Sequence, residues 1–272
     1  MYAVLDGGLG ATRRAGAAVV PLAWDALFDL LSPGYCRECG CEVGASDAPF
    51  CPVCLQRVRW IAWACPCCGT MLPPPSAVPR ELEFTDCGRC ALHGRLATAT
   101  AVAGIYEGPL RSAIVRYKFH GDAGVRPFLL EAARRAAMRP WMERSLLEAE
   151  ALVPVPQHWT KTAWRGRNPL LDLAQESAIG SHLGPPLPVV SLLRKRRWTP
   201  PQVRLSGNLR RCNLRGSFEV APWPLRLRRV ILFDDVMTTG TTLAECTRVL
   251  YRAGVESVAL IVLALVENAP LR

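Results

Sequence analysis

The sequence predicts an α/β protein in which a mostly parallel sheet is flanked by helices and preceded by a cysteine-rich module. Three observations lead to this prediction. Strand-like and helix-like segments alternate from about residue 97 onward, a pattern typical of parallel sheets with helices on both faces. Ten of the twelve cysteines fall between Cys36 and Cys90. An apolar run at 230–233 leads into two acids and a short loop of threonine and glycine.

Residues 1–35 are predicted to be a loose tail followed by an amphipathic helix. Four apolar residues recur at helical spacing and would share one face: Trp24, Leu27, Phe28 and Leu31. Arg13 and Arg14 precede an apolar stretch, but Asp25 follows it at once, so a signal peptide is the weaker interpretation. No apolar run in the chain approaches the ~20 residues that a membrane helix needs. We therefore expect a cytoplasmic protein without a membrane span.

Residues 36–96 are predicted to form a double zinc ribbon, because four CxxC pairs follow one another. Eleven residues separate the first pair from the second, and eighteen separate the third from the fourth. Each CxxC turn points two thiolates at one ion, and two turns complete a tetrahedral zinc site. The predicted ligands are Cys36, Cys39, Cys51 and Cys54 at the first site and Cys65, Cys68, Cys87 and Cys90 at the second.

The remaining cysteines leave the choice of ligands open by one residue. Cys41 and Cys67 each lie beside a CxxC turn and could replace a neighbour. Cys212 is interpreted as a loop thiol and Cys246 as part of a helix core. A disulfide framework is the alternative to zinc, but it needs an oxidising compartment and the sequence has no convincing export signal. Zinc is therefore favoured.

The zinc ribbons are predicted to be structural. Between residues 36 and 90 there are five arginines and six acids, and each four-cysteine zinc site adds about two negative charges. Such a module does not attract nucleic acid by its charge alone. Trp60 and Trp63 could stack on bases, but packing of both against the larger domain is the favoured interpretation.

Residues 97–272 are predicted to form the main α/β domain. Apolar residues near a spacing of 3.6 predict helices at 108–119 and 125–138. A third helix, at 168–179, would have Asn168 as its N-cap and Pro169 in its first turn. Short apolar runs predict buried strands. The expected strands lie at 97–106, 151–156, 189–193, 230–233 and 257–266, and the last expected helix lies at 242–254.

Positive charge is concentrated in one irregular segment, 194–229. It holds ten arginines and Lys195 against the single acid Glu219, which gives +11 − 1 = +10, equal to the net charge of the whole chain. A segment of this kind attracts phosphates, on a small ligand or on nucleic acid. A solvated basic face is the alternative interpretation.

The segment VILFDDVMTTGTT, 230–242, is predicted to be a buried central strand followed by a phosphate-binding loop and a helix. Backbone N–H groups of the loop would surround a phosphate, with the helix N-terminus behind them. The residues of this loop are Thr238, Thr239, Gly240, Thr241 and Thr242. Asp234 and Asp235 would accept hydrogen bonds from ribose hydroxyls and, with Mg²⁺, hold a diphosphate-bearing sugar. A Walker B strand is the alternative, but it requires a P-loop and the chain has no Gly-Lys pair.

This loop resembles the phosphoribosyl-diphosphate (PRPP) loop of type I phosphoribosyltransferases. Together with the cysteine ribbons, residues 24–268 resemble the ComF family (ComFC/GntX-like), whose members are double-zinc-ribbon phosphoribosyltransferases associated with competence and DNA uptake. Five further segments fit the resemblance: Tyr106–Leu110, Lys118–Asp122, Val153–Pro156, Thr199–Gln202 and Asn213–Phe218. The resemblance implies a type I phosphoribosyltransferase fold for 97–272, with single-stranded DNA and other competence proteins as partners.

The resemblance also implies roles for individual residues. Lys118 would meet the diphosphate, whereas a solvated helix end is its alternative role. Asp234 and Asp235 would be the catalytic residues. The family's Arg-Gly-Phe-Asn-Gln stretch meets Arg165-Gly166-Arg167-Asn168-Pro169 here, so any ligand contact of that glutamine is lost.

Two functions from different classes follow. The first is an enzyme that binds PRPP with magnesium and transfers phosphoribose to an acceptor. The second is a competence factor that binds single-stranded DNA through the basic segment and uses PRPP as a regulatory ligand or not at all. Nucleobase salvage is a third and weaker hypothesis, because salvage enzymes seldom need zinc ribbons.

Overall fold

The computed structural model describes residues 34–44, 48–74, 87–156, 168–196, 216–222 and 226–267. The predicted N-terminal helix lies outside the described residues. So do Cys212, the stretch 165–167 and most of the basic segment 194–229. None of the helices in the described part of the chain is long and apolar enough to cross a bilayer.

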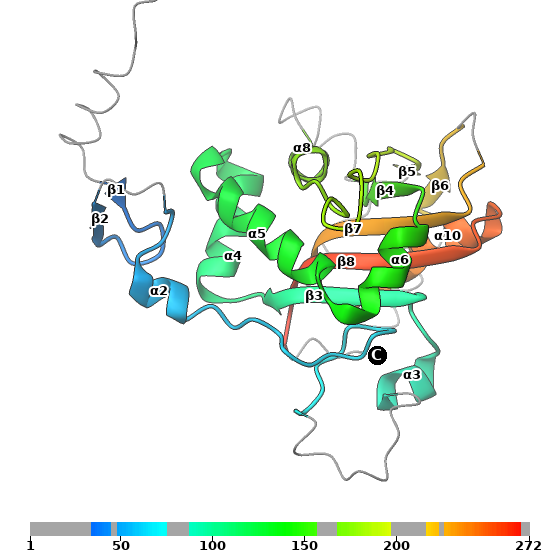
Figure 1. Cartoon of the computed structure of the whole chain (residues 1–272), viewed down its shortest axis with the longest axis horizontal. Coiled ribbons are helices and arrows are strands. Elements are labelled where there is room, and N and C mark those ends of the chain that lie inside the picture. Colours follow the sequence, from blue (N-terminus) through cyan, green and yellow to red (C-terminus); the bar gives the residue numbers. More distant parts are fainter. Residues whose placement is uncertain are drawn as a thin grey trace, which may run out of the picture.

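Four parallel strands form the sheet at the centre of the molecule (Figure 1). Their order is β3 (Ala99–Ile105), β8 (Ser257–Leu265), β7 (Arg229–Met237) and β4 (Ala151–Pro154). All four are largely apolar and buried, because helices cover both faces of the sheet. The predicted fold class, a parallel sheet flanked by helices, is confirmed.

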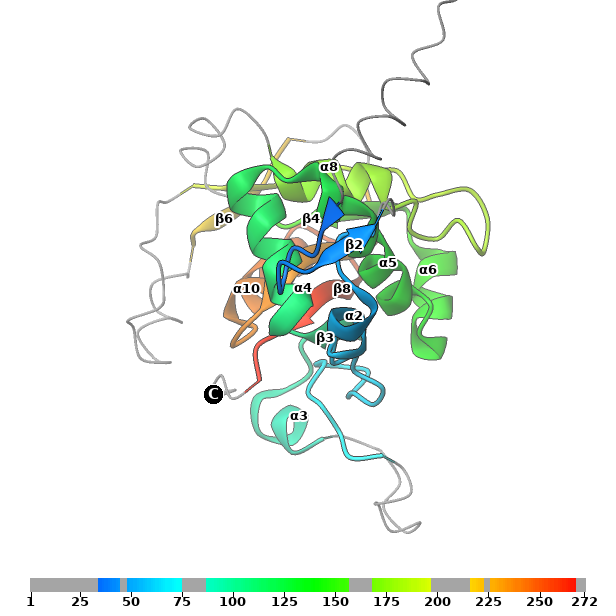
Figure 2. The same ribbon diagram turned by 90° about the vertical axis from the view of Figure 1, so that its left-hand side faces the viewer.

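The helices of two of the connections cover opposite faces of the sheet (Figures 1 and 2). The chain crosses the sheet in one direction from β3 to β4 and in the opposite direction from β7 to β8. Because such crossovers are right-handed, the helices of the two connections cover opposite faces. The first connection contains α4 (Gly108–Val115), the π-helical turn η2 (Arg116–His120), η3 (Ala123–Val125), α5 (Arg126–Ala137), η4 (Pro140–Met142) and α6 (Glu143–Glu148), and the second contains α10 (Thr241–Arg252).

Helix α8 (Pro169–Glu176) packs against α5 and begins as predicted. The Asn168 side chain accepts a hydrogen bond from the amide of Leu171 at 3.4 Å, and Pro169 opens the first turn. This start persists although the sequence departs from the family pattern at Arg167 and Pro169.

The strand predicted at 189–193 is wrong. Val189 contributes a single bridge to Leu152, and the strand β5 is Leu193–Lys195, paired antiparallel with β6 (Phe218–Val220). The apolar run at 189–193 correctly indicated burial, since Val190, Leu192 and Leu193 are buried. It could not indicate where the pairing partner lies, more than twenty residues further along the chain.

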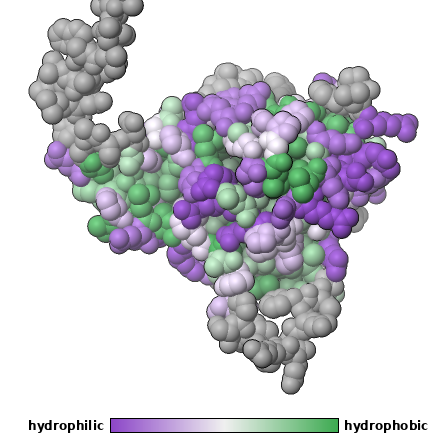
Figure 3. All heavy atoms as spheres, viewed as in Figure 1, coloured by the Kyte–Doolittle hydropathy of each residue, from purple (hydrophilic) through white to green (hydrophobic). Residues whose placement is uncertain are grey.

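The cysteine-rich region wraps around one edge of the sheet (Figure 1). Its elements are β1 (Gly34–Tyr35), β2 (Glu42–Gly44), α2 (Pro52–Gln56) and α3 (Gly88–His93). Trp60 packs against the ring of Phe128 as predicted, with 5.8 Å between centroids, whereas the Trp63 side chain is exposed. Figure 3 shows apolar surface on the side of β1, β2 and α2 and mainly hydrophilic surface on the side of β5 and β6.

Candidate phosphate-binding loop and cysteine clusters

The predicted phosphate loop lies where β7 loses one of its neighbours. Strand β4 pairs with β7 only as far as Phe233, whereas β8 continues beside it to Met237. Asp234 and Asp235 therefore lie inside β7, which ends four residues later than the predicted end at Phe233. They are placed where the sheet opens on the β4 side. Such openings at the carboxyl ends of parallel strands are where α/β sheets bind ligands.

The turn from β7 to α10 has the backbone of an anion site. Gly240 has φ +73°, in the left-handed region that favours glycine. No side chain of the described residues caps the N-terminus of α10, so its first amides keep their hydrogen-bonding capacity. The hydroxyls of Thr239 and Thr241 lie 2.7 Å apart beside them. The helix dipole and free amides together favour a bound anion.

Lys118 is brought to the two acids from a different element. It lies in η2, a π-helical turn, and π-turns are frequent at functional sites. Its ammonium forms an ion pair with the Asp235 carboxylate. Burial works to lower the pKa of Lys118, but Asp235 and then Asp234 keep that pKa above its ordinary value. The fold thus joins the predicted lysine to the predicted acids, 117 positions apart in the sequence.

Asp234 is the buried member of the acid pair. Burial, followed by the adjacent charge of Asp235, raises the pKa of Asp234 to about 8, although Lys118 opposes this rise. The Asp235 amide donates to Asp234 Oδ1 at 2.9 Å. Asp235 and Lys118 balance each other in charge while Asp234 keeps its proton. The two carboxyl groups supply the oxygen ligands that Mg²⁺ prefers once Asp234 ionises. These residues fit a magnesium-bound ligand.

The second cysteine cluster has the geometry of a tetrahedral zinc site. The thiols of Cys65, Cys68, Cys87 and Cys90 all lie within 4.8 Å of one another. The sulfur–sulfur distance is 3.8 Å between Cys65 and Cys90 and 3.4 Å between Cys68 and Cys87. Zinc–sulfur bonds of ~2.3 Å in a tetrahedron place sulfurs ~3.8 Å apart. The four thiols fit one zinc ion, as predicted.

The first cluster brings five thiols together instead of four. Cys36, Cys39, Cys41 and Cys51 lie within 4.8 Å of one another. Cys54, the predicted fourth ligand, is buried beside them, and its amide donates to Cys51 Sγ at 3.5 Å. Four cysteines of this cluster can hold zinc, and Cys41 competes with Cys54 for one position.

The second cluster shows which position Cys41 takes. The Cys36 amide donates to the Cys41 carbonyl at 2.7 Å, and the Cys65 amide donates to the Thr70 carbonyl at 2.8 Å. Cys41 Sγ lies 3.4 Å from Cys39 Sγ, and Thr70 Oγ1 lies 3.2 Å from the sulfur of Cys68. Cys41 is therefore the counterpart of Thr70, a neighbour of the ligands. This equivalence favours the predicted set with Cys54.

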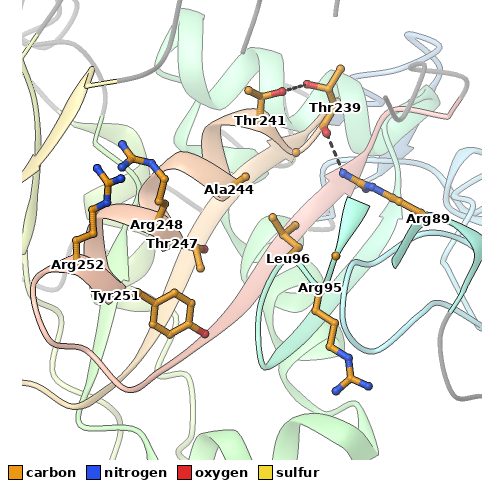
Figure 4. Close-up of a pocket in the computed structure, with 12 residues that line it drawn as sticks. Arg89, Arg95, Leu96, Thr239, Thr241, Ala244, Thr247, Arg248, Tyr251 and Arg252 are labelled. Carbon is orange, nitrogen blue, oxygen red and sulfur yellow. Dashed lines mark hydrogen bonds between the residues drawn. The ribbon is translucent and has the colours of Figure 1, made fainter. Parts of the chain in front are cut away.

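A groove of about 630 Å³ separates α3 from α10 and reaches the phosphate loop (Figure 4). Arg248, Tyr251 and Arg252 line it from α10, and Arg89 lines it from α3. Arg89 Nη2 donates to the Thr239 carbonyl at 2.9 Å. None of these four residues was predicted from the sequence. Only the spacing of Arg248 and Arg252, four apart on an expected helix, gave a signal that they share a face.

Comparison with known proteins identifies relatives along most of the chain. No family model matches it. DNA utilization protein YhgH of Salmonella typhimurium (strain LT2) is 28% identical over 229 residues, which cover 84% of this chain and 96% of the relative. Competence protein F of Haemophilus influenzae is 28% identical over 229 residues, covering 82% and 93%. The chain is a homologue of these proteins. The resemblance to the ComF family is confirmed.

Two solved structures are also similar to this chain, the homologue of Competence protein F. Orotate phosphoribosyltransferase from Aeropyrum pernix has 18% identity and a TM-score of 0.32, covering 58% of this chain and 78% of that one. The allosteric regulatory enzyme of purine biosynthesis has 20% identity and a TM-score of 0.30, covering 51% and 25%.

Proposed function

We propose that the chain binds PRPP together with Mg²⁺ at the β7–α10 loop, as a ComF-type phosphoribosyltransferase-like protein acting in natural competence and DNA uptake. One observation carries the proposal. A central strand that contains two acids at its open end passes through a left-handed glycine into a helix whose first amides have no side-chain cap. This arrangement suits a sugar that carries both hydroxyls and phosphate.

Each predicted residue has a role in this proposal. The amides from Thr238 to Thr242 hold the phosphate on the sugar. Asp234 and Asp235 accept hydrogen bonds from the ribose hydroxyls and are the candidate catalytic residues. Lys118 exchanges its ion pair with Asp235 for the diphosphate. Bound magnesium would neutralise part of the diphosphate charge.

Positioning and charge stabilisation carry most of phosphoribosyl transfer, so the site needs no nucleophilic side chain. As the sugar becomes oxocarbenium-like, the carboxylates face growing positive charge and the diphosphate leaves. Transfer to an acceptor and use of PRPP as a regulatory ligand both begin with this binding step. Nucleobase salvage is the weaker alternative, because the names of the relatives refer to competence and DNA utilization.

Calorimetric titration with PRPP and Mg²⁺ tests the proposal. Wild type should give saturable heat, and Asp234→Ala/Asp235→Ala should give none, because the variant lacks the ribose and cation ligands. Glu143→Ala, on the exposed first turn of α6, should bind like wild type. Absence of heat with folded, zinc-loaded wild type would contradict the proposal.

The groove between α3 and α10 favours a second candidate function, binding of single-stranded DNA. Arg248 and Arg252 can contact phosphates, and the half-exposed Tyr251 ring can stack on a base. The DNA-binding surface predicted from the sequence is a different one, the basic segment that begins at Arg194.

Binding of a labelled oligonucleotide at increasing salt separates these two tracks. Affinity should fall steeply with salt, and Tyr251→Ala with Arg252→Gln should weaken binding more than Arg194→Gln with Arg196→Gln. Arg144→Gln, an exposed arginine on α6, is the charge-matched control. Equal affinities for all variants would rule out the groove as the DNA site.

A further inference from the structure

Arg89 connects the second cysteine cluster to the phosphate loop. It lies in α3, between the ligand positions Cys87 and Cys90, so zinc at this cluster would fix the backbone on both sides of it. Its side chain leaves the cluster and its Nη2 donates to the Thr239 carbonyl at 2.9 Å (Figure 4). A hydrogen bond across 150 positions of sequence thus links a metal centre to an anion-binding turn.

The hydrogen bond sets the direction of a neighbouring amide. The peptide between Thr239 and Gly240 is trans, so its C=O and N–H point in opposite directions. Because Arg89 holds the Thr239 carbonyl toward α3, the Gly240 N–H is turned away from α3. That N–H is one of the donors assigned to the phosphate. Arg89 therefore orients the donor without contacting the sugar.

Close packing limits other arrangements of this turn. A Cβ added to Gly240 would lie 2.9 Å from Arg89 Nη2, so the arginine occupies the space that any other side chain would need. Arg89 Nη1 is buried and has no hydrogen-bond partner among the described residues. A buried donor without a partner is costly, and an anion nearby would relieve that cost.

The rest of the cluster also contacts β3 and the end of β7, the strand that leads into the loop. The Thr100 hydroxyl, on β3, donates to the Cys67 carbonyl at 3.0 Å. A Cβ on Gly69 would lie 3.0 Å from atoms of Met237, Thr100 and Val102, so this CxxC turn is pressed against the end of β7. Zinc would hold both halves of the cluster, and with them Arg89, against the loop.

We propose that Arg89 is a positioning residue of the phosphate loop, and that zinc at the second cluster and the phosphoribosyl ligand at the loop bind cooperatively. This inference rests on the proposed function for its ligand. Coupling of this kind is reciprocal, so the ligand must also stabilise the zinc.

Three measurements test the inference. Calorimetry with PRPP and Mg²⁺ should show affinity about ten- to a hundredfold lower for Arg89→Gln, as expected for a lost hydrogen bond to a charged group. Arg89→Lys should recover part of the lost PRPP affinity. Arg57→Gln, an exposed arginine of the same cysteine-rich region, should bind like wild type. PRPP should slow the transfer of zinc to a chromogenic chelator in wild type but not in Arg89→Gln.

Hydrogen exchange of the free protein separates this inference from the proposed function. The Ala244 amide, which donates to the Gly240 carbonyl at 2.9 Å, should exchange faster in Arg89→Gln, with both zinc ions retained. If wild type binds no PRPP, the proposed function fails, and the role of Arg89 is decided by this exchange alone. Exchange in Arg89→Gln that equals wild type would contradict this role. A PRPP affinity of Arg89→Gln equal to that of wild type would contradict it as well.

Discussion

The two cysteine clusters use the same turns but are joined to the sheet in different ways. The first is attached through side chains: Arg37 pairs with Asp122 at 2.8 Å, and the buried Phe50 ring meets Phe128 with 5.1 Å between centroids. Its Cys39 and Cys41 are exposed. The second is attached to β3 through the amide and hydroxyl of Thr100, which donate to the carbonyls of Pro66 and Cys67, and through Arg89 to the phosphate loop. One metal ligand set can therefore support the periphery of the fold in one place and a binding site in another.

Removing one ligand from each cluster gives the largest expected contrast. Cys90→Ser should lose one zinc, several kcal/mol of unfolding free energy, and detectable PRPP binding, because Arg89 then loses its support. Cys54→Ser should also lose one zinc yet bind PRPP with nearly the affinity of wild type. Zinc analysis, thermal unfolding and calorimetry measure the three effects. Equal loss of PRPP binding in both variants would remove the distinction between the clusters.

Asp234→Asn tests the phosphate site itself, which lies beside the second cluster. The quantity compared is the free energy of unfolding of the variant and of wild type at two pH values. The folded-state pKa of Asp234, about 8, lies above its ordinary value of 3.8. The folded chain therefore keeps a proton that the unfolded chain has lost, and the free energy of unfolding falls as pH rises from about 4 to 8. Asparagine cannot ionise, so the variant should exceed wild type by roughly 2–4 kcal/mol at pH 8 and by less at pH 5.5.

Urea unfolding of both proteins at the two pH values measures this difference, since zinc affects both alike. The same variant should bind PRPP and Mg²⁺ far more weakly, because it lacks a carboxylate ligand. A variant that is no more stable than wild type at pH 8 would show that Asp234 is ionised in the folded protein.

Cys41→Thr is the smallest expected change. It gives the first cluster the residue that the second has at Thr70, so two zinc ions and a nearly unchanged unfolding temperature are expected. Loss of one zinc in Cys41→Thr, together with retention in Cys54→Ser, would make Cys41 the fourth ligand.

Local patterns in the sequence were sufficient for several features. The CxxC spacing predicted the cysteine clusters, the apolar run at 230–233 predicted a central strand, and Asn168 predicted a helix start, because neighbouring residues determine each of them. The end of β7 was not predictable in this way. Its pairing with β8 continues to Met237 after β4 has stopped, and register between strands is a property of the assembled sheet.

The contact of Arg89 with Thr239 could not be predicted for the same reason. An arginine between two cysteines has the pattern of an ordinary surface residue, and only the folding of β3 beside β8 brings α3 to the loop. The fold class and the ribbons were therefore readable from sequence, whereas the link between them was not.

The most direct test of the central claim is the amide spectrum of the ¹⁵N-labelled protein during titration with PRPP and Mg²⁺. We predict that the largest shifts fall on Gly240, Thr241 and Thr242, followed by Asp235, with smaller shifts around Arg89 and none around Cys41. Shifts confined to residues outside the β7–α10 loop, or no shifts at saturating ligand, would contradict the account.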